Sequence, residues 1–249
     1  MNTVLIRQLS LDYCCSEQEI LDPKNIFTVY RPIDGRRRFP GDNDTFLKAA
    51  VFHGKLLMSG SEKVIDRCAD TFKDFNAAWF MEPNALFRLN QMIGEFGYSV
   101  HSAHPFFLGE RLSSVPEGDF ELLHLSSSEI EDFRGNTDFS NAFGFYEDLP
   151  DVLGVAAYRD GRILGAAGAS ADSPAMWQVG IDVLPRFRGQ GIATALVTAL
   201  KNEIIQNGRL PFYGTALSHV ASMRTALAAG FFPAWAELSC RRTVDNAMR

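Results

Sequence analysis

One short stretch limits the possible folds of this chain more than any other. Residues 183–197 are "VLPRFRGQGIATALV": an apolar strand ends, two arginines and two glycines follow without an acid, and an apolar helix begins. Apolar residues recur at every fourth position from Ile192 to Ile204, which predicts one apolar stripe along this helix. Asn207 and Gly208 follow, a pair that favours the left-handed turn ending many helices. The stretch therefore predicts a strand, a tight turn and a helix that packs on a sheet.

The start of this helix lacks the Ser, Thr, Asp or Asn that usually caps a helix. Residues 188–191 are Arg-Gly-Gln-Gly, so the N–H groups of the first turn have no side-chain acceptor nearby. Free N–H groups, the positive end of the helix dipole and glycines that permit close approach together favour an anion, and Arg186 and Arg188 add positive charge. Water could satisfy these donors instead. The turn alone therefore leaves an anion site and a solvated helix start as alternatives.

The elements around the turn predict a mixed sheet flanked by helices. Asp160–Gly161 between two apolar runs is typical of a β-hairpin. The expected strands are residues 120–125, 152–159, 163–170, 177–183, 211–216 and 235–240, with helices opening at 126–128 and covering 218–229 in addition to the helix after the turn.

The upstream part of the chain predicts a smaller α/β domain. Strands are expected at residues 26–32, 55–60, 77–80 and 98–108, and helices at 61–74 and 83–96. Residues 113–121 are small and polar and contain proline and glycine, which is typical of a linker. We therefore predict two domains, residues 1–115 and 116–249.

Composition excludes several classes of function. The 249 residues are 46% hydrophobic and carry a formal charge of −6, which disfavours a nucleic-acid partner or an anionic membrane because both need a basic surface. No secretory signal and no membrane-spanning run is expected. The four cysteines have neither disulfide-type nor metal-type spacing, and His101 and His104 lack a third ligand. We expect a cytoplasmic protein with no bound metal.

Two common phosphate-binding motifs do not fit the turn. A dinucleotide fingerprint would need glycine at the position of Thr194 and a parallel βαβ unit, whereas a hairpin precedes this strand. A P-loop would need Gly-Lys followed by Ser or Thr, which is absent from the turn. A nucleotide- or phosphometabolite-binding α/β protein is therefore disfavoured.

One family pattern does fit. Arg186-x-x-Gly189-x-Gly191-x-Ala193, preceded by "VGIDVLP", resembles the acetyl-CoA-binding motif of the GNAT superfamily of N-acetyltransferases. The segment "SHVASMRTALAAGF" (residues 218–231) is similar to the second helix of that family, with Ser222 at its serine position. The resemblance covers about residues 120–240 and implies a GNAT-like mixed sheet in the C-terminal half. A less recognisable α/β first half is similar to a two-part subfamily.

The resemblance implies transfer of an acetyl group from acetyl-CoA directly to a primary amine of a small molecule. The N–H groups of the turn would hold the pyrophosphate, and the strand before it would bind the pantetheine arm. The N–H of Ile181 would polarise the acetyl carbonyl. The residues expected to bind acetyl-CoA are Ile181, Asp182, Val183, Arg186, Arg188, Gly189, Gln190, Gly191, Ile192, Ala193 and Ser222. For Asp182, a structural hydrogen bond is the alternative, because strand alternation turns it away from Ile181.

The sequence departs from the family where side chains usually move protons. The tyrosine that often acts as the acid corresponds to Ala226, and the asparagine of the second helix corresponds to His219. The frequent glutamate of the cofactor-side strand corresponds to Trp177 or Gln178. Chemistry therefore needs other groups, or the protein is a non-catalytic acyl-CoA-binding sensor or scaffold.

Three residues are candidate catalytic replacements. His219 opens the second helix, and its imidazole suits proton transfer near neutral pH, although a surface histidine is the simpler interpretation. Tyr213 starts the strand beside the expected cleft and is a candidate acid. Glu237 lies on the last strand and could face the acceptor. The identity of the acceptor amine and the oligomeric state do not follow from the sequence.

Overall fold

The computed structural model describes residues 2–38 and 46–243, which form two compact units. The first unit contains residues 2–36, 46–105 and 234–243, and the second contains residues 37–38 and 106–233. This division differs from the predicted boundary at 115/116. The first unit ends earlier and also takes up the last strand, because that strand pairs with one from residues 47–52. Whether residues 1–115 and 116–249 act as separate domains stays a prediction.

The second unit is built on a mixed sheet. The last residues of β4 pair antiparallel with β9, β9 pairs in parallel with β8, and β8, β7, β6 and β5 follow in antiparallel order. Asp160 and Gly161 both have positive φ, 50° and 71°, as a tight β-hairpin requires, so the predicted hairpin is confirmed. The strands are β4 (Tyr98–Leu108), β5 (Glu121–Leu125), β6 (Asp151–Arg159), β7 (Arg162–Ser170), β8 (Met176–Val183) and β9 (Leu210–Gly214).

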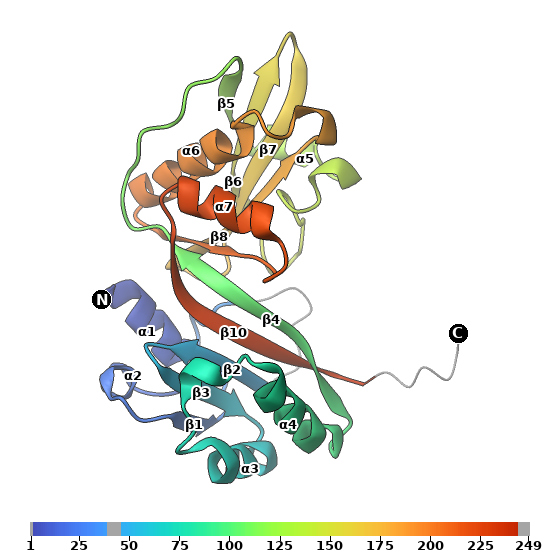
Figure 1. The fold of residues 1–249 in the computed structure, drawn as a ribbon. Helices are drawn as coiled ribbons and strands as arrows, with labels where there is room; N and C mark the ends of the chain where they lie inside the picture. The colour runs from blue at the N-terminus through green and yellow to red at the C-terminus, as the bar shows by residue number, and fades with distance from the viewer. Residues whose placement is uncertain (1, 39–45, 244–249) are drawn as a thin grey trace. The chain divides into compact units, whose positions relative to one another are not determined.

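Helices cover both faces of this sheet (Figure 1). On one face, α6 (Ile192–Gln206) buries its predicted apolar stripe against β6, β7 and β8, and α7 (Val220–Ala228) packs beside α6. On the other face, a phenylalanine-rich cluster joins α5 (Ser127–Glu131) and the short helix η2 (Thr137–Phe139) to the sheet. The turn before α6 contains one more short helix, η3 (Pro185–Phe187). The mixed α+β fold predicted for this part of the chain is confirmed.

The first residue of the predicted linker, Ser113, is hydrogen-bonded to the C-terminal half of α6. Ser113 exchanges two hydrogen bonds with the side chain of Asn202, at 3.1 and 2.8 Å, and its hydroxyl accepts one from Lys201 at 2.6 Å. Lys201 is fully buried and also donates to the carbonyl of Ala229 at the end of α7, at 2.7 Å. Burial lowers the pKa of the Lys201 ammonium. Residues 114–119 are exposed, as a linker would be.

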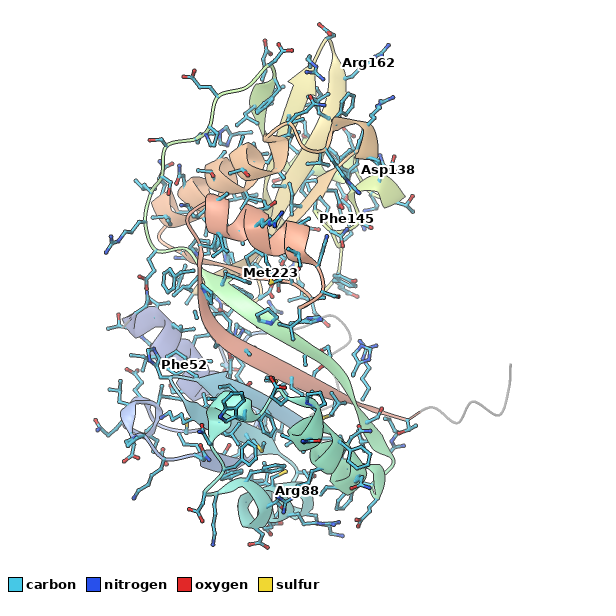
Figure 2. All side chains as sticks on the ribbon, in the orientation of Figure 1. Phe52, Arg88, Asp138, Phe145, Arg162 and Met223 are labelled. Atoms are coloured by element: carbon cyan, nitrogen blue, oxygen red, sulfur yellow. The ribbon has the colours of Figure 1, made fainter. Side chains whose placement is uncertain are left out.

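The first unit is a smaller α/β layer. Its sheet pairs β1 in parallel with β3, and β2 lies between β3 and β10 in antiparallel order. An apolar cluster fills the space between this sheet and two helices, α3 and α4. The elements are α1 (Thr3–Asp12), α2 (Glu17–Leu21), β1 (Ile26–Val29), β2 (Leu47–Phe52), β3 (Lys55–Gly60), α3 (Glu62–Phe72), η1 (Ala77–Trp79), α4 (Pro83–Gly94) and β10 (Phe232–Arg242). Figure 2 marks Phe52 in this unit, where it is 1% exposed.

Two predictions for this unit were wrong or incomplete. Residues 77–80 form a 3₁₀ turn and not a strand, because the Asn76 side chain accepts the N–H of Ala78 at 3.1 Å and thereby starts a helical turn. Helices α1 and α2 were not predicted. No helix among residues 2–38 and 46–243 is both long and apolar enough to cross a membrane.

Candidate active site

The site begins where two parallel strands separate. β8 and β9 pair only from Met176↔Leu210 to Gln178↔Phe212, so residues 179–183 have β7 as their partner strand on one edge alone. Just beyond the end of β8, the N–H of Leu184 donates to the carbonyl of Leu164 in β7, at 2.9 Å. Because backbone groups alternate along a strand, the N–H of Ile181 points the other way, to the edge that β9 has left.

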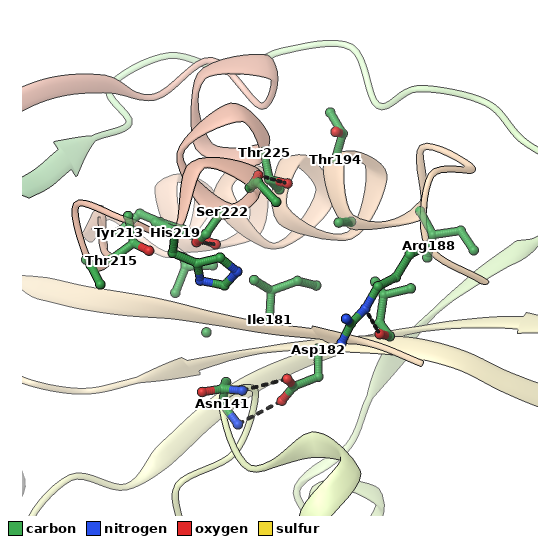
Figure 3. A pocket seen from close by; sticks show the side chains of 18 of the residues that line it. Asn141, Ile181, Asp182, Arg188, Thr194, Tyr213, Thr215, His219, Ser222 and Thr225 are labelled. Carbon is green, nitrogen blue, oxygen red and sulfur yellow. Dashed lines mark hydrogen bonds between the residues drawn. The ribbon is translucent and has the colours of Figure 1, made fainter. Parts of the chain in front are cut away.

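A pocket of about 640 Å³ occupies the space between the separated strands and the starts of α6 and α7 (Figure 3). Its walls come entirely from the second unit. Predicted site residues that line it are Ile181, Asp182, Val183, Arg188, Gly189, Gly191, Ile192, Ala193, Tyr213, His219 and Ser222. Residues with no role predicted from the sequence, among them Asn141, Phe187, Thr215 and Thr225, line it as well.

The turn before α6 presents bare backbone to this pocket. Gly189 and Gly191 have φ of 77° and 79°, the left-handed region in which side chains are strained, and a Cβ built on either would meet nothing within 4 Å. Gly191 caps α6 without a side-chain hydrogen bond, and the first N–H of the helix with a carbonyl partner is that of Ala195. Arg188 Nε donates to the Val183 carbonyl at 3.0 Å, which fixes the turn on the end of β8. The N–H groups before Ala195 are therefore available to a ligand.

Two predicted residues of the turn do not line the pocket. The Arg186 guanidinium lies over the Phe187 ring, 4.7 Å from its centre, and Gln190 is exposed. Arg159, for which no role was predicted from the sequence, has its guanidinium 5.6 Å from the centre of the same ring and donates to Gln190 Oε1 at 3.5 Å. The strand order could have indicated Arg159, because it ends β6 next to the hairpin that leads into β7 and β8.

The start of α7 carries the polar side chains of the opposite wall. His219 caps this helix without a side-chain hydrogen bond and is exposed. The hydroxyls of Tyr213 and Ser222 are 2.8 Å apart, so the phenol already has a partner. Burial raises the pKa of Tyr213, and the bond to Ser222 opposes that shift. Of the two candidate catalytic residues here, Tyr213 is hydrogen-bonded to Ser222, whereas the exposed His219 side chain can contact a ligand.

Asp182 faces the opposite side of β8 from Ile181, as strand alternation predicted. Its carboxylate accepts from the Asn141 N–H at 2.7 Å and from the Asn141 Nδ2 at 2.7 Å (Figure 3). It also accepts from the Ala142 N–H at 2.9 Å. These bonds attach the loop after η2 to the sheet. The structural role weighed for Asp182 is therefore present, and no local sequence pattern indicated its partner Asn141.

Glu237 lies outside this pocket. It belongs to the part of β10 that pairs with β2 in the first unit, opposite Ala50. Its carboxylate is buried and accepts from the Tyr13 hydroxyl at 2.8 Å and from Trp235 Nε1 at 3.0 Å. The structure does not bring it together with the other candidates, because the strand expected to line the acceptor side continues into the other unit.

A family model matches the part of the chain that contains this pocket. Residues 120–231 match the model of the Acetyltransferase (GNAT) family, whereas no curated protein sequence matches the chain significantly. Similar solved structures include a putative GNAT-family acetyltransferase from Novosphingobium aromaticivorans, with 17% identity, a TM-score of 0.41 and coverage of 58% of this chain and 66% of that one. A GCN5-related N-acetyltransferase-like protein from Streptococcus suis has 18% identity and a TM-score of 0.46, with 63% and 68% covered.

A third structure, a GCN5-related N-acetyltransferase from Kribbella flavida, has 21% identity and a TM-score of 0.45, with 59% and 62% covered. The chain thus spans about two thirds of the length of these structures. The family match falls on the unit that holds the separated strands, the glycine turn and both flanking helices. Residues 120–231 therefore form a domain of the GNAT acetyltransferase family.

Proposed function

We propose that this protein is an N-acetyltransferase that moves an acetyl group from acetyl-CoA directly to a primary amine of a small molecule. One observation carries the proposal: the free edge of β8 leads straight to the uncapped start of α6 within a single pocket. An open strand edge suits an extended amide-containing arm, and a bare helix start suits a pyrophosphate. A ligand with both parts in that order fits this pocket.

The residues present fit coenzyme A. The N–H groups from Gly189 to Ala193 would donate to its pyrophosphate, next to the open space beside the two glycines. Arg159, Arg186 and Arg188 add positive charge near the turn. The backbone of residues 179–183 would pair with the pantetheine amides. Acetyl-CoA supplies a thioester, whose carbonyl carbon forms the new C–N bond as its C–S bond breaks.

The chain would contribute two further functions to the transfer. The N–H of Ile181, which points to the free edge, would donate to the carbonyl oxygen as that oxygen gains negative charge. His219 would take the proton that the amine loses, and the leaving thiolate would recover one from His219 or from water. Tyr213 is a weaker candidate for the acid because its hydroxyl is bonded to Ser222.

A second candidate function rests on a specific observation. The position of the usual acid is Ala226, whose methyl side chain has no ionisable proton to donate. A non-catalytic acyl-CoA-binding sensor or scaffold would have the same open turn without that acid. Cys14, Cys15 and Cys68 are free thiols, which fits the cytoplasmic location that we propose for either function.

One experiment separates these functions. Acetyl-CoA binding is measured by calorimetry, and release of free thiol from acetyl-CoA is followed over a panel of alkylamines, amino acids and aminoglycosides. Binding with thiol release that depends on an amine supports the enzyme. Binding without release on any amine supports the sensor or scaffold. Absence of binding contradicts both.

A further inference from the structure

We propose that Asp182 fixes the side-chain amide of Asn141 so that its oxygen, Oδ1, accepts a hydrogen bond from the acceptor amine. This inference rests on the proposed function and names a specificity-determining residue for it. Asn141 lines the pocket from the loop after η2, on the face of β8 opposite α6 and α7. Figure 3 shows the two side chains together on that side of the strand.

The orientation of the Asn141 amide follows from the chemistry of its partner. A carboxylate only accepts hydrogen bonds, so the Asn141 group that faces Asp182 Oδ1 at 2.7 Å must be the NH₂. The oxygen of the same amide then points away from Asp182. No hydrogen bond within residues 2–38 and 46–243 uses this oxygen, and Asn141 is exposed to the pocket. Asn141 therefore presents an acceptor that is open to a ligand.

The backbone around Asn141 is held as firmly as its side chain. Asp182 Oδ2 accepts the N–H groups of Asn141 and Ala142, at 2.7 and 2.9 Å. The loop also lies against two glycines of the sheet: a Cβ on Gly180 would be 1.9 Å from the Asn141 carbonyl oxygen, and one on Gly168 would be 2.1 Å from that of Ala142. Side chains at these positions would push the loop away. Asn141 Oδ1 is thus fixed in place before any ligand arrives.

This arrangement favours a cationic N–H donor. The three groups bonded to Asp182 are neutral, so the negative charge of Asp182 is not compensated by them. A protonated amine next to Asn141 would donate to Oδ1 and be attracted by the carboxylate behind it. A hydroxyl group could also donate to Oδ1, but it carries no positive charge, so the Asp182 carboxylate would attract it less than an ammonium group. The pocket is therefore expected to select ammonium groups over hydroxyl acceptors.

The decisive variant is Asp182→Asn, because it reverses the polarity that Asn141 presents. The new amide oxygen can keep the two backbone N–H bonds, while its NH₂ donates to Asn141 Oδ1. The Asn141 amide would then turn its NH₂ to the pocket, where it opposes an ammonium donor. Asn141→Ala removes the contact without this reversal. Asn136→Ala is the matched control, since Asn136 caps η2 in the same loop and does not line the pocket.

The experiment measures acceptor KM, kcat, acetyl-CoA Kd and Tm for each variant, with the amine that gives the wild type its lowest KM in the panel. We expect Asn141→Ala and Asp182→Asn each to raise acceptor KM about tenfold or more, with acetyl-CoA Kd unchanged, since a hydrogen bond to a charged group is lost. The double variant should add little to either single change, because both act through one contact. Asn136→Ala should leave KM unchanged.

Three results would overturn the inference while leaving the proposed function intact. The first is an unchanged acceptor KM in Asn141→Ala in a protein that still binds acetyl-CoA. The second is an Asp182→Asn effect on KM that adds fully to that of Asn141→Ala. The third is a lower Tm and kcat with normal KM in Asp182→Asn, since Asp182 would then support the fold alone. A wild-type protein that releases no thiol with any amine would instead contradict the proposed function, and the inference with it.

Discussion

Two helices of the same unit begin in opposite ways. At the start of α5, Ser126 and Glu129 satisfy each other in a capping box, with the Glu129 carboxylate accepting the Ser126 N–H at 2.7 Å. At the start of α6, Gly191 supplies no side chain, and its neighbours leave the first N–H groups open. A side-chain cap typically stabilises a helix by about 1 kcal/mol. Because α6 lacks such a cap and begins in the pocket, its first N–H groups remain available to a ligand.

The largest expected effect comes from giving α6 an acceptor of its own. Gly191→Asp places a carboxylate where the pyrophosphate would bind, so it should weaken acetyl-CoA binding by about a hundredfold or more through repulsion and competition for the N–H groups. Calorimetry on the folded variant measures this. Gly208→Asp is the matched control, because Gly208 has a similar φ of 70°, equally open surroundings and no place in the pocket. Equal affinities in both variants would break the comparison between the two helix starts.

The start of α7 extends the comparison to a third helix, which also lacks a side-chain cap and also faces the pocket. If His219 takes the proton of the amine, His219→Ala should lower kcat/KM at least about tenfold and flatten the acidic limb of the pH profile, with acetyl-CoA affinity little changed. His219→Asn restores the usual residue of the family and separates position from proton transfer. Full activity with an unaltered profile in both variants would remove His219 from the mechanism.

A substitution at the capped start of α5 should lower stability and leave acetyl-CoA binding unchanged. Ser126→Ala removes the acceptor for the Glu129 N–H, so we expect the free energy of unfolding to fall by about 1 kcal/mol, measured by urea denaturation. Acetyl-CoA affinity should not change, because Ser126 does not line the pocket. A loss of acetyl-CoA affinity would show that the starts of α5 and α6 are coupled. It would contradict the view that the first stabilises the fold and the second binds the ligand.

The smallest expected effect is a difference in acid sensitivity. The hydrogen bonds from Ser126 lower the pKa of Glu129 from its ordinary value of 4.5. A lowered folded-state pKa means that this contribution is complete above about pH 4.5 and is lost as the pH falls through the lower folded value. The protection factors of amides in the first turn of α5, which are corrected for the intrinsic slowing of exchange in acid, should therefore fall on acidification. The first turn of α6, which has no carboxylate cap, should not follow this titration. Identical profiles for the two turns would contradict the expectation.

The same contrast explains which parts of the structure could be predicted from sequence. The anion-binding turn before α6 could be predicted because a site made of backbone N–H groups depends on local sequence: neighbouring glycines and arginines, and the absence of a capping side chain. The capping box of α2, in which Ser16 and Glu19 bond reciprocally, had an equally local Ser-x-x-Glu pattern, although the helix was not predicted. Residues 77–80 were wrongly predicted to form a strand, because a short apolar run occurs in strands and in helical turns alike.

Contacts between distant segments could not be predicted. Asn141 meets Asp182 from 41 residues away, and Glu237 meets Tyr13 from 224 residues away. No periodicity or spacing encodes such pairs, because they depend on which strands become neighbours. The backbone part of the site could therefore be predicted from a single sequence, whereas the side chains expected around the acceptor could be identified only from the structure.

The buried ammonium of Lys201 has a consequence for how this protein can change during evolution. A Cβ on Gly109 would come within 2.9 Å of the Lys201 side chain, and one on Gly230 would come within 3.0 Å of its nitrogen and 2.9 Å of the Ser113 hydroxyl. The long side chain and the small neighbours thus fill one volume between them. A shorter residue at position 201 is therefore expected to leave room for a larger one at Gly109, whereas the φ of 84° at Gly230 still favours glycine there.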